Sequence, residues 1–196
     1  MRCIITAFIS LDGVTQAPGG AEEDTDGGFA HGGWSAPFFD PETMGGAWDE
    51  MARRGDALLQ GRRTYTVSAQ AWAPQSGDPF ADWINRVQKY VVSDTLTEAD
   101  ATWDPTEIIR GADLEKKVAE LREQPGGDIV VMGSSQVARS LLSADLVDGL
   151  TLMIEPIVLG GGKSIYPTDG LARTFELTDV ATSPTGVQIC KYTRAR

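Results

Sequence analysis

Two glycine turns followed by polar residues form the part of the sequence best suited to chemistry. The first contains Gly61 in LLQGRRTYTV, and the second contains Gly133 in VVMGSSQVARSLL. Each turn follows a short apolar run and precedes a segment with the pattern of a helix. A turn residue without a Cβ, placed just before a helix, lets a phosphate approach main-chain N–H groups. The two turns therefore predict an anion site.

The first turn also carries the side chains that a phosphorylated dinucleotide would need. Guanidinium groups of Arg62 and Arg63 suit a 2′-phosphate, while the Gly61 backbone and the Thr64 hydroxyl suit a pyrophosphate. The alternative is a solvated first helical turn, although arginine at a helix N-terminus opposes the helix dipole. No G-x-G-x-x-G followed by an acidic residue is present, which argues against an ordinary NAD site. The pattern favours NADPH.

Further cofactor contacts are expected from the second turn and from two other strand ends. The second turn could equally be a tight turn with a serine cap, and the residues at the other strand ends could be ordinary surface residues. The candidates are Gly133, Ser134, Ser135, Gln136, Val137, Ser93 and Arg110.

Three other residues are candidates for the reacting end of the site. Asp12 either faces the substrate or serves as the turn residue before Gly13. Trp34 and Trp48 could stack on a planar heterocycle, although core packing explains Trp48 equally well. The glycine-rich stretch 159–163 is either a hairpin without a ligand or a support for the cofactor.

Composition excludes several classes of function. The chain has 196 residues, 41% of them hydrophobic, which predicts one domain over residues 1–196. Its net charge of −11 argues against nucleic acid as a partner. We expect no membrane span and no signal peptide, and therefore a cytoplasmic protein in which Cys3 and Cys190 stay reduced. His31 is the sole histidine, so neither a Ser-His-Asp relay nor a metal site is expected.

The order of apolar runs predicts an α/β fold. Continuous apolar runs typical of buried parallel strands alternate with helical patterns, and a hairpin around 183–186 ends the chain. We expect a mostly parallel sheet with an antiparallel C-terminal edge and helices on both faces. The acidic, glycine-rich segment 14–40 has no periodicity, so it is either functional or disordered. Expected strands cover 2–10, 57–60, 90–93, 107–109 and 128–132; expected helices begin at Pro41, with caps at Asp78 and Asp113, and after Ser135.

Five stretches together resemble the dihydrofolate reductase-like superfamily, and within it the branch of the bacterial riboflavin-biosynthesis reductase domain. They are ITAFISLDGV, LLQGRRTY, YVVSDTL, DIVVMGSSQVARSLL and LVDGLTLMIEPIVLGGGKSIYP. The resemblance implies a mixed sheet of about eight strands with NADPH across its carboxyl edge. It also implies that 61–64 and 133–137 hold the phosphates, that Ser93 and Asp94 border the adenosine, and that the protein forms a homodimer.

The chain departs from that superfamily at one position. Dihydrofolate reductases carry a carboxylate on the first long helix, where counting back from Gly61 places Gly45. This argues against folate as the substrate. We therefore expect an NADPH-dependent reductase for another small planar nitrogen heterocycle, with hydride transfer to a C=N or C=O bond and proton transfer from solvent or Asp12. A non-catalytic dinucleotide or metabolite binder and a flavin-binding oxidoreductase are the alternatives.

Overall fold

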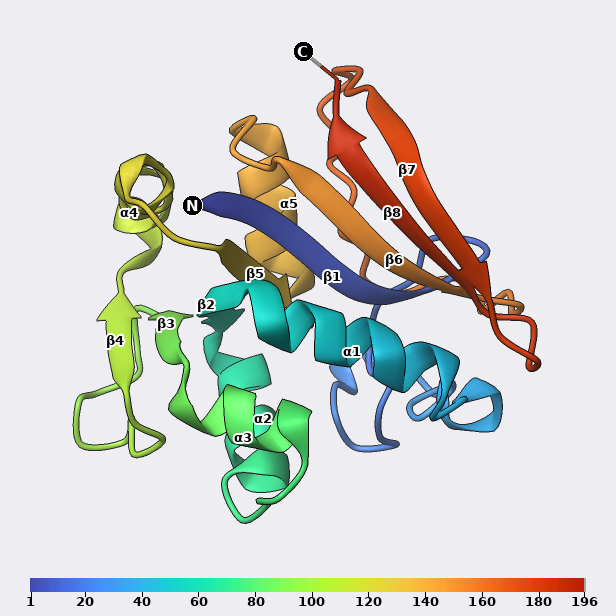
Figure 1. Cartoon of the computed structure of the whole chain (residues 1–196), viewed down its shortest axis with the longest axis horizontal. Helices are drawn as coiled ribbons and strands as arrows, with labels where there is room; N and C mark the ends of the chain where they lie inside the picture. The colour runs from blue at the N-terminus through green and yellow to red at the C-terminus, as the bar shows by residue number, and fades with distance from the viewer. Residues whose placement is uncertain (196) are drawn as a thin grey trace.

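The computed structural model describes residues 1–195 and contains an eight-stranded sheet flanked by five α-helices (Figure 1). The strand order is β4-β3-β2-β5-β1-β6-β8-β7. The strands are β1 (Arg2–Ser10), β2 (Gly55–Gly61), β3 (Gln88–Val92), β4 (Thr106–Ile109), β5 (Asp128–Met132), β6 (Gly149–Glu155), β7 (Phe175–Thr182) and β8 (Gln188–Arg194). The first six positions in the order are parallel, and β8 and β7 form an antiparallel edge. The predicted fold class is confirmed.

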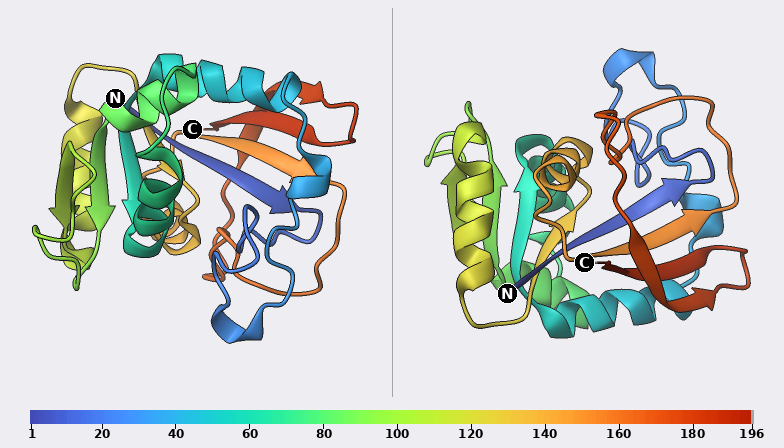
Figure 2. Two further views of the ribbon diagram at one scale, coloured as in Figure 1. Left: turned by 90° about the horizontal axis from the view of Figure 1, so that it is seen from below. Right: turned by 90° about the horizontal axis from the view of Figure 1, so that it is seen from above.

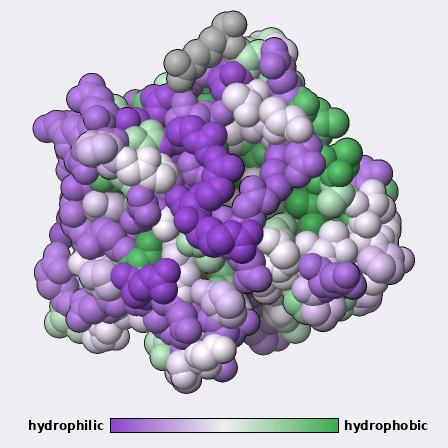
Figure 3. All heavy atoms as spheres, viewed as in Figure 1, coloured by the Kyte–Doolittle hydropathy of each residue, from purple (hydrophilic) through white to green (hydrophobic). Residues whose placement is uncertain are grey.

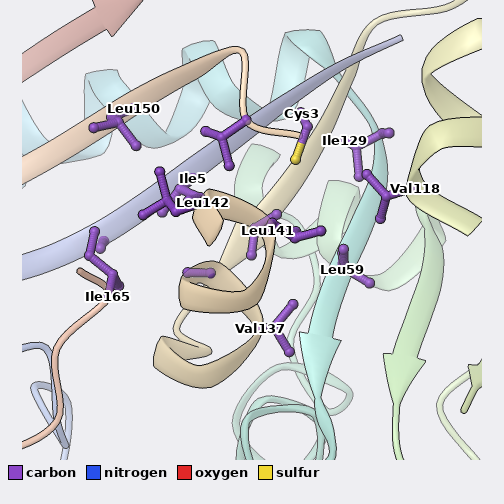
Figure 4. Packing of buried hydrophobic residues seen from close by; sticks show 14 of the residues in the cluster. Cys3, Ile5, Leu59, Val118, Ile129, Val137, Leu141, Leu142, Leu150 and Ile165 are labelled. Atoms are coloured by element: carbon purple, nitrogen blue, oxygen red, sulfur yellow. The ribbon is translucent and has the colours of Figure 1, made fainter. Parts of the chain in front are cut away.

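Helices cover both faces of the sheet (Figure 2). They are α1 (Thr43–Arg54), α2 (Arg62–Trp72), α3 (Pro79–Arg86), α4 (Leu114–Glu123) and α5 (Ser135–Ser143), with short 3-10 turns at Asp26–Gly28, Ala36–Phe38 and Gly111–Asp113. Side chains of α4 and α5 pack with Cys3, Ile5, Leu59 and Ile129 on one face (Figure 4). Side chains of α1, α2 and α3 pack on the other face.

β1 and β5 occupy the middle of the sheet, and most of their residues are buried. Cys3, Ile5 and Ile129 are at most 1% exposed, as expected for β-branched and apolar runs covered on both faces. Both strands have the predicted bounds. Cys3 and Cys190 are free, buried thiols.

The predicted helix caps have different outcomes. Asp78 accepts hydrogen bonds from the N–H groups of Phe80 and Ala81, both over 3.0 Å, and caps α3 as predicted. Asp113 occupies the predicted N-cap position of α4, but its side chain makes no cap hydrogen bond, and α4 continues from the 3-10 turn Gly111–Asp113.

The segment 14–40 is held by hydrogen bonds around Gln16. The Gln16 amide donates to the carbonyls of Asp24 and Asp26, both over 3.0 Å, and its side-chain oxygen accepts from the Lys163 N–H over 3.0 Å. The Trp34 indole donates to the Gln16 carbonyl over 2.7 Å. These hydrogen bonds order the segment, which argues against the disordered alternative.

Candidate functional site

The two glycine turns lie side by side at the carboxyl edge of the sheet. Gly61 ends β2 and the Gly133 turn follows β5, and these strands are parallel neighbours. A chain of hydrogen bonds joins the turns: the Gly61 N–H donates to Ser134 Oγ over 2.8 Å, and Ser134 Oγ donates to Thr64 Oγ1 over 2.9 Å. Thr64 Oγ1 then donates to the Gly133 carbonyl over 3.1 Å. The predicted convergence is therefore present.

The close approach of the two turns explains why Gly133 is a glycine. Its φ is +69°, and a Cβ there would lie 2.9 Å from Thr64 Cγ2. A side chain at this position would therefore strain the backbone and push the turns apart. Val137 lies beside the first turn, since a Cβ on Gly61 would lie 3.6 Å from Val137 Cγ2.

Helices α2 and α5 begin at these turns, and neither has a side-chain cap at its N-terminus. The residues that precede α2 and α5, Gly61 and Ser134, make no side-chain bond to the first helical turn, whereas Asp78 caps α3. Uncapped first turns leave main-chain N–H groups available to an anion. Ser135 and Gln136 belong to the first turn of α5, and Ser135 Oγ lies 2.8 Å from Thr15 Oγ1 in the segment after β1. This geometry fits phosphate groups.

The two arginines of the first turn have different surroundings. Arg63 forms ion pairs with Asp24 and with Asp26, the latter over 2.6 Å, and Lys163 pairs with the same two carboxylates over 2.5 and 2.7 Å. These hydrogen bonds hold the pKa of the Asp26 carboxyl below its ordinary value and raise the pKa of Arg63. Arg62 is exposed, and no ion pair is described for it among residues 1–195. Of the two guanidinium groups expected to bind phosphate, only that of Arg62 is exposed without a described ion pair. The Arg63 guanidinium is already bound by the protein's own acidic segment.

The residues expected at the adenosine end lie together after β3 and β4. The Ser93 hydroxyl accepts from the N–H groups of Thr95 and Leu96 over 3.1 and 2.8 Å. Arg110 donates to the Ser93 carbonyl over 3.2 Å, and Asp94 accepts from the Gly111 N–H over 3.0 Å. Their side chains stabilise the two loops in this state. The strand order places these loops on the same edge as Gly61, one and two strands further out.

Asp12 has the surroundings of a turn residue. Its carboxylate accepts from Ser10 Oγ over 2.6 Å and from the N–H groups of Leu159 and Gly160, the latter over 2.7 Å. These hydrogen bonds lower the pKa of Asp12 to about 2, the Ser10 bond contributing most. The carboxyl is therefore ionised at neutral pH, and the geometry favours the turn role over proton donation. The bonds also place stretch 159–163 beside the end of β1.

The two tryptophans expected at the substrate are packed within the protein. Trp34 is 5% exposed and its indole N–H is bound to Gln16. Trp48 packs between the rings of Phe8, Phe39 and Phe80 at centroid distances of 6.0, 5.6 and 5.2 Å. The core alternative therefore fits Trp48, although its ring is only partly buried.

Sequence reasoning missed Glu155, the last residue of β6. Its side chain is fully buried, accepts from Ser35 Oγ over 2.6 Å, and has its pKa raised to about 7 by burial. The available signal was an acidic residue at the end of the apolar run LTLMIE. The ion-paired acids Asp24 and Asp26 were also missed, because no spacing in a loop indicates which distant cations it contacts.

A cavity of about 110 Å³ lies away from these turns, between α1 and the amino-terminal halves of the central strands. Its charged walls are paired, Arg54 with Asp128 over 3.2 Å and Lys191 with Glu50 over 2.6 Å. Pairing leaves little charge for a ligand there. Within residues 1–195 no cluster of side chains could hold a metal ion and no helix could cross a membrane.

The sheet order and the turns at its carboxyl edge define a dihydrofolate reductase-like α/β protein. Dihydrofolate reductase from Enterococcus faecalis, complexed with NADP(H), superposes with a TM-score of 0.58 at 13% identity, covering 100% of this chain and 97% of that one. A putative riboflavin biosynthesis protein from Shewanella sp. PV-4 gives a TM-score of 0.74 at 19% identity, with both chains fully covered.

Within this class, the chain belongs to the RibD C-terminal domain family, whose model matches residues 2–190. It is 27% identical over 170 residues to the uncharacterized protein YyaP of Bacillus subtilis (strain 168), covering 84% of this chain and 80% of that protein. The predicted family resemblance is confirmed.

Proposed function

We propose that the protein is an NADPH-dependent reductase of a small planar nitrogen heterocycle, similar to a pterin or a pyrimidine. One observation carries this proposal: the Gly61 and Gly133 turns are joined through Ser134 and Thr64, with two uncapped helix N-termini beside them. Membership of the RibD C-terminal domain family supports a reductase, and the NADP(H) in the similar dihydrofolate reductase supports the cofactor.

The chain's own residues would bind and orient the cofactor. Main-chain N–H groups at the starts of α2 and α5 would hold the diphosphate, with Arg62 at the 2′-phosphate. The loops of Ser93 and Arg110 would border the adenosine. Bound NADPH would supply a hydride from its nicotinamide, and the protein would contribute positioning and exclusion of water. The ordered segment 14–40 would help to exclude that water.

Asp12 and the two tryptophans have roles in this proposal other than those expected from the sequence. Asp12 anchors the 159–160 turn rather than supplying a proton, because its carboxylate is ionised and already accepts hydrogen bonds from three groups. Trp34, which is 5% exposed, and Trp48, which packs against Phe80, would shape the site by packing rather than by stacking on substrate.

A direct assay tests the proposal. Purified protein is mixed with NADPH and a panel of pterins, pyrimidines and quinoid compounds, and absorbance of the reduced nicotinamide is followed. Oxidation that depends on one heterocycle supports the reductase. Tight NADPH binding with no oxidation by any compound would instead support the non-catalytic binder, and a yellow protein on purification would support a flavoprotein.

We also propose a homodimer. Leu177 and Val180 on the edge strand β7 are 55% and 52% exposed, and they pair with Tyr192 and Cys190, so they lie on one face of the sheet. Figure 3 shows hydrophobic residues at the side of the molecule where β7 lies. Two such edges could cover one another. Light scattering of the protein and of a Leu177→Lys, Val180→Lys variant tests this, and a monomeric wild type would refute it.

A further inference from the structure

Glu155 has a buried carboxyl group of which one oxygen has no partner. The residue is 0% exposed at the end of β6, and Ser35 Oγ donates to Oε1 over 2.6 Å. Within residues 1–195, Glu155 Oε2 and Gln60 Oε1 are the buried side-chain oxygen atoms without a hydrogen-bond partner. Buried polar atoms rarely lack a hydrogen-bond partner. Glu155 Oε2 therefore requires a partner that the folded chain does not provide.

Glu155 lies where the reacting end of the proposed site would be. In the strand order, β6 stands beyond the phosphate turns of β2 and β5, on the side away from the adenosine loops of β3 and β4. Glu155 pairs with Ser10, the last residue of β1, at the same carboxyl edge as the glycine turns. It lies on the same face of β6 as Met153, two residues earlier, which packs with Met44 at the start of α1. Ser35 belongs to the segment that covers this edge, just before the 3-10 turn Ala36–Phe38 near the ends of β1 and β6 (Figure 2).

The surroundings of Glu155 keep it able to hold a proton near neutral pH. Burial raises its pKa from 4.5 to about 7, and the Ser35 hydrogen bond is the one opposing contribution. No charged neighbour contributes, from β1, from β6 or from the covering segment. In its neutral form the carboxyl presents an O–H donor beside a carbonyl acceptor. This pair of groups complements the N–C–N edge of a pterin or pyrimidine, which also offers an acceptor beside a donor.

We propose that Glu155 binds the nitrogen edge of the substrate and supplies the proton of the reduction, and that the segment carrying Ser35 covers it until substrate enters. This inference rests on the proposed reductase. As hydride adds to the carbon of the C=N bond, the π electron pair moves to the nitrogen, which forms a bond to the proton of Glu155. The O–H bond breaks and leaves a carboxylate, which takes a proton from water after the product leaves.

Asp12 is poorly suited to this role. It lies just beyond the same strand end, but its carboxylate has a pKa of about 2 and accepts from Ser10, Leu159 and Gly160. Glu155 has none of these bonds. Its one described side-chain partner is the Ser35 hydroxyl, on the segment that would have to move for a ligand to reach the carboxyl.

Proton-linked binding tests the inference without turnover. Calorimetric titration of 2-amino-4-oxopyrimidine and of pterin, in two buffers with different ionisation enthalpies between about pH 6 and 8, counts protons exchanged on binding. The wild type should exchange a fraction of a proton, and Glu155→Gln should exchange none and bind roughly tenfold or more weakly. Glu176→Gln, on the exposed edge strand β7, is the matched control and should behave as the wild type.

A second measurement keeps the test valid if Glu155→Gln does not fold. Infrared spectra of the wild type should contain a protonated carboxyl band that titrates near neutral pH. Ser35→Ala keeps the carboxyl but removes the bond that lowers its pKa, so the band should persist to higher pH. An unchanged titration in Ser35→Ala would overturn the assignment.

The outcomes for Glu155 and for the reductase can be told apart. NADPH binding is followed in the same samples by quenching of tryptophan fluorescence. If the wild type binds NADPH but Glu155→Gln keeps the same proton exchange, or if no heterocycle binds, the role of Glu155 is refuted. If the wild type binds no NADPH, the proposed function fails, whatever Glu155 does.

Discussion

Ser134 donates its hydroxyl proton to the hydroxyl of Thr64 over 2.9 Å, across a separation of 70 residues in the chain. Ser134 also accepts from the Gly61 N–H over 2.8 Å, so it connects the two strand ends. Chains of such bonds strengthen each member and fix the geometry of the groups they join. The two helix N-termini are therefore held in one arrangement before any ligand arrives.

Ser134→Ala should weaken both the fold and cofactor binding. The Gly61 N–H would lose its acceptor in a partly buried place, and an unsatisfied group of this kind costs about 1–3 kcal/mol. We expect a lower free energy of unfolding in urea and a higher Kd for NADPH. Ser140→Ala, on the same helix α5 but with no side-chain hydrogen bond described, is the control. Unchanged NADPH affinity in Ser134→Ala would contradict the phosphate role of these turns.

Arg62→Ala should weaken the binding of NADPH more than the binding of NADH. A charge-assisted hydrogen bond to the 2′-phosphate is worth about 1.5–3 kcal/mol, which corresponds to a loss of roughly tenfold or more in NADPH affinity. NADH lacks that phosphate and should bind almost as before. Fluorescence titration of both cofactors measures the ratio, with Arg53→Ala, an exposed arginine of α1, as the control. Equal losses for the two cofactors would argue against a 2′-phosphate contact.

Replacing Asp24 and Asp26 together by asparagine should strengthen NADPH binding. The change frees Arg63 and Lys163 from their carboxylate partners, and the potential at the first turn becomes more positive. The gain should shrink as salt is added, because these groups are partly exposed. Glu22→Gln removes a charge from the same segment without breaking a described ion pair, and it should leave affinity nearly unchanged. Weaker NADPH binding in the double variant would show that the acids support the site.

The position of the two glycine turns could be predicted from the sequence, but the ion pairs around them could not. Gly61 and Gly133 were found because a turn after a buried strand has a local signature, and parallel strands bring such turns to one edge. The partner of Arg63 was not found, because ion pairs with Asp24 depend on how a loop without periodicity folds. Trp48 fitted two interpretations, and only the packing of Phe8 and Phe80 around it distinguishes them.

Stability should depend on the protonation of Glu155 between about pH 4.5 and 7. Its pKa is raised in the folded state, so the neutral form fits the fold and stability is fully present below the unfolded value of 4.5. As pH rises from 4.5 to about 7, Glu155 ionises in the unfolded chain but stays neutral in the folded state. The pKa shift corresponds to a loss of ~3 kcal/mol from the free energy of unfolding, complete once the folded state also ionises. The free energy of unfolding of the wild type should fall over this window. Glu155→Gln should lack that fall and Glu176→Gln should retain it, and parallel curves for all three proteins would contradict the raised pKa.

Asp12→Ala should loosen the 157–160 turn rather than change the protonation chemistry. It removes the acceptor for the N–H groups of Leu159 and Gly160. We expect faster amide hydrogen exchange in this turn. The pH dependence of turnover should keep its shape, because a carboxyl with a pKa of about 2 does not titrate near neutral pH. If Asp12→Ala lost the acidic or the basic limb of its pH–activity profile, Asp12 would instead be supported as a proton donor.

The placement of β1 also affects how the chain must fold. β1 precedes both of its partners in the chain by more than 100 residues, because these partners are β5 and β6, from residues 128–132 and 149–155. During synthesis, β1 would therefore expose apolar side chains until its partner strands, which end at residue 155, have been made. Fragments that end before Asp128 should aggregate, and chaperone dependence should be greatest during this interval of translation.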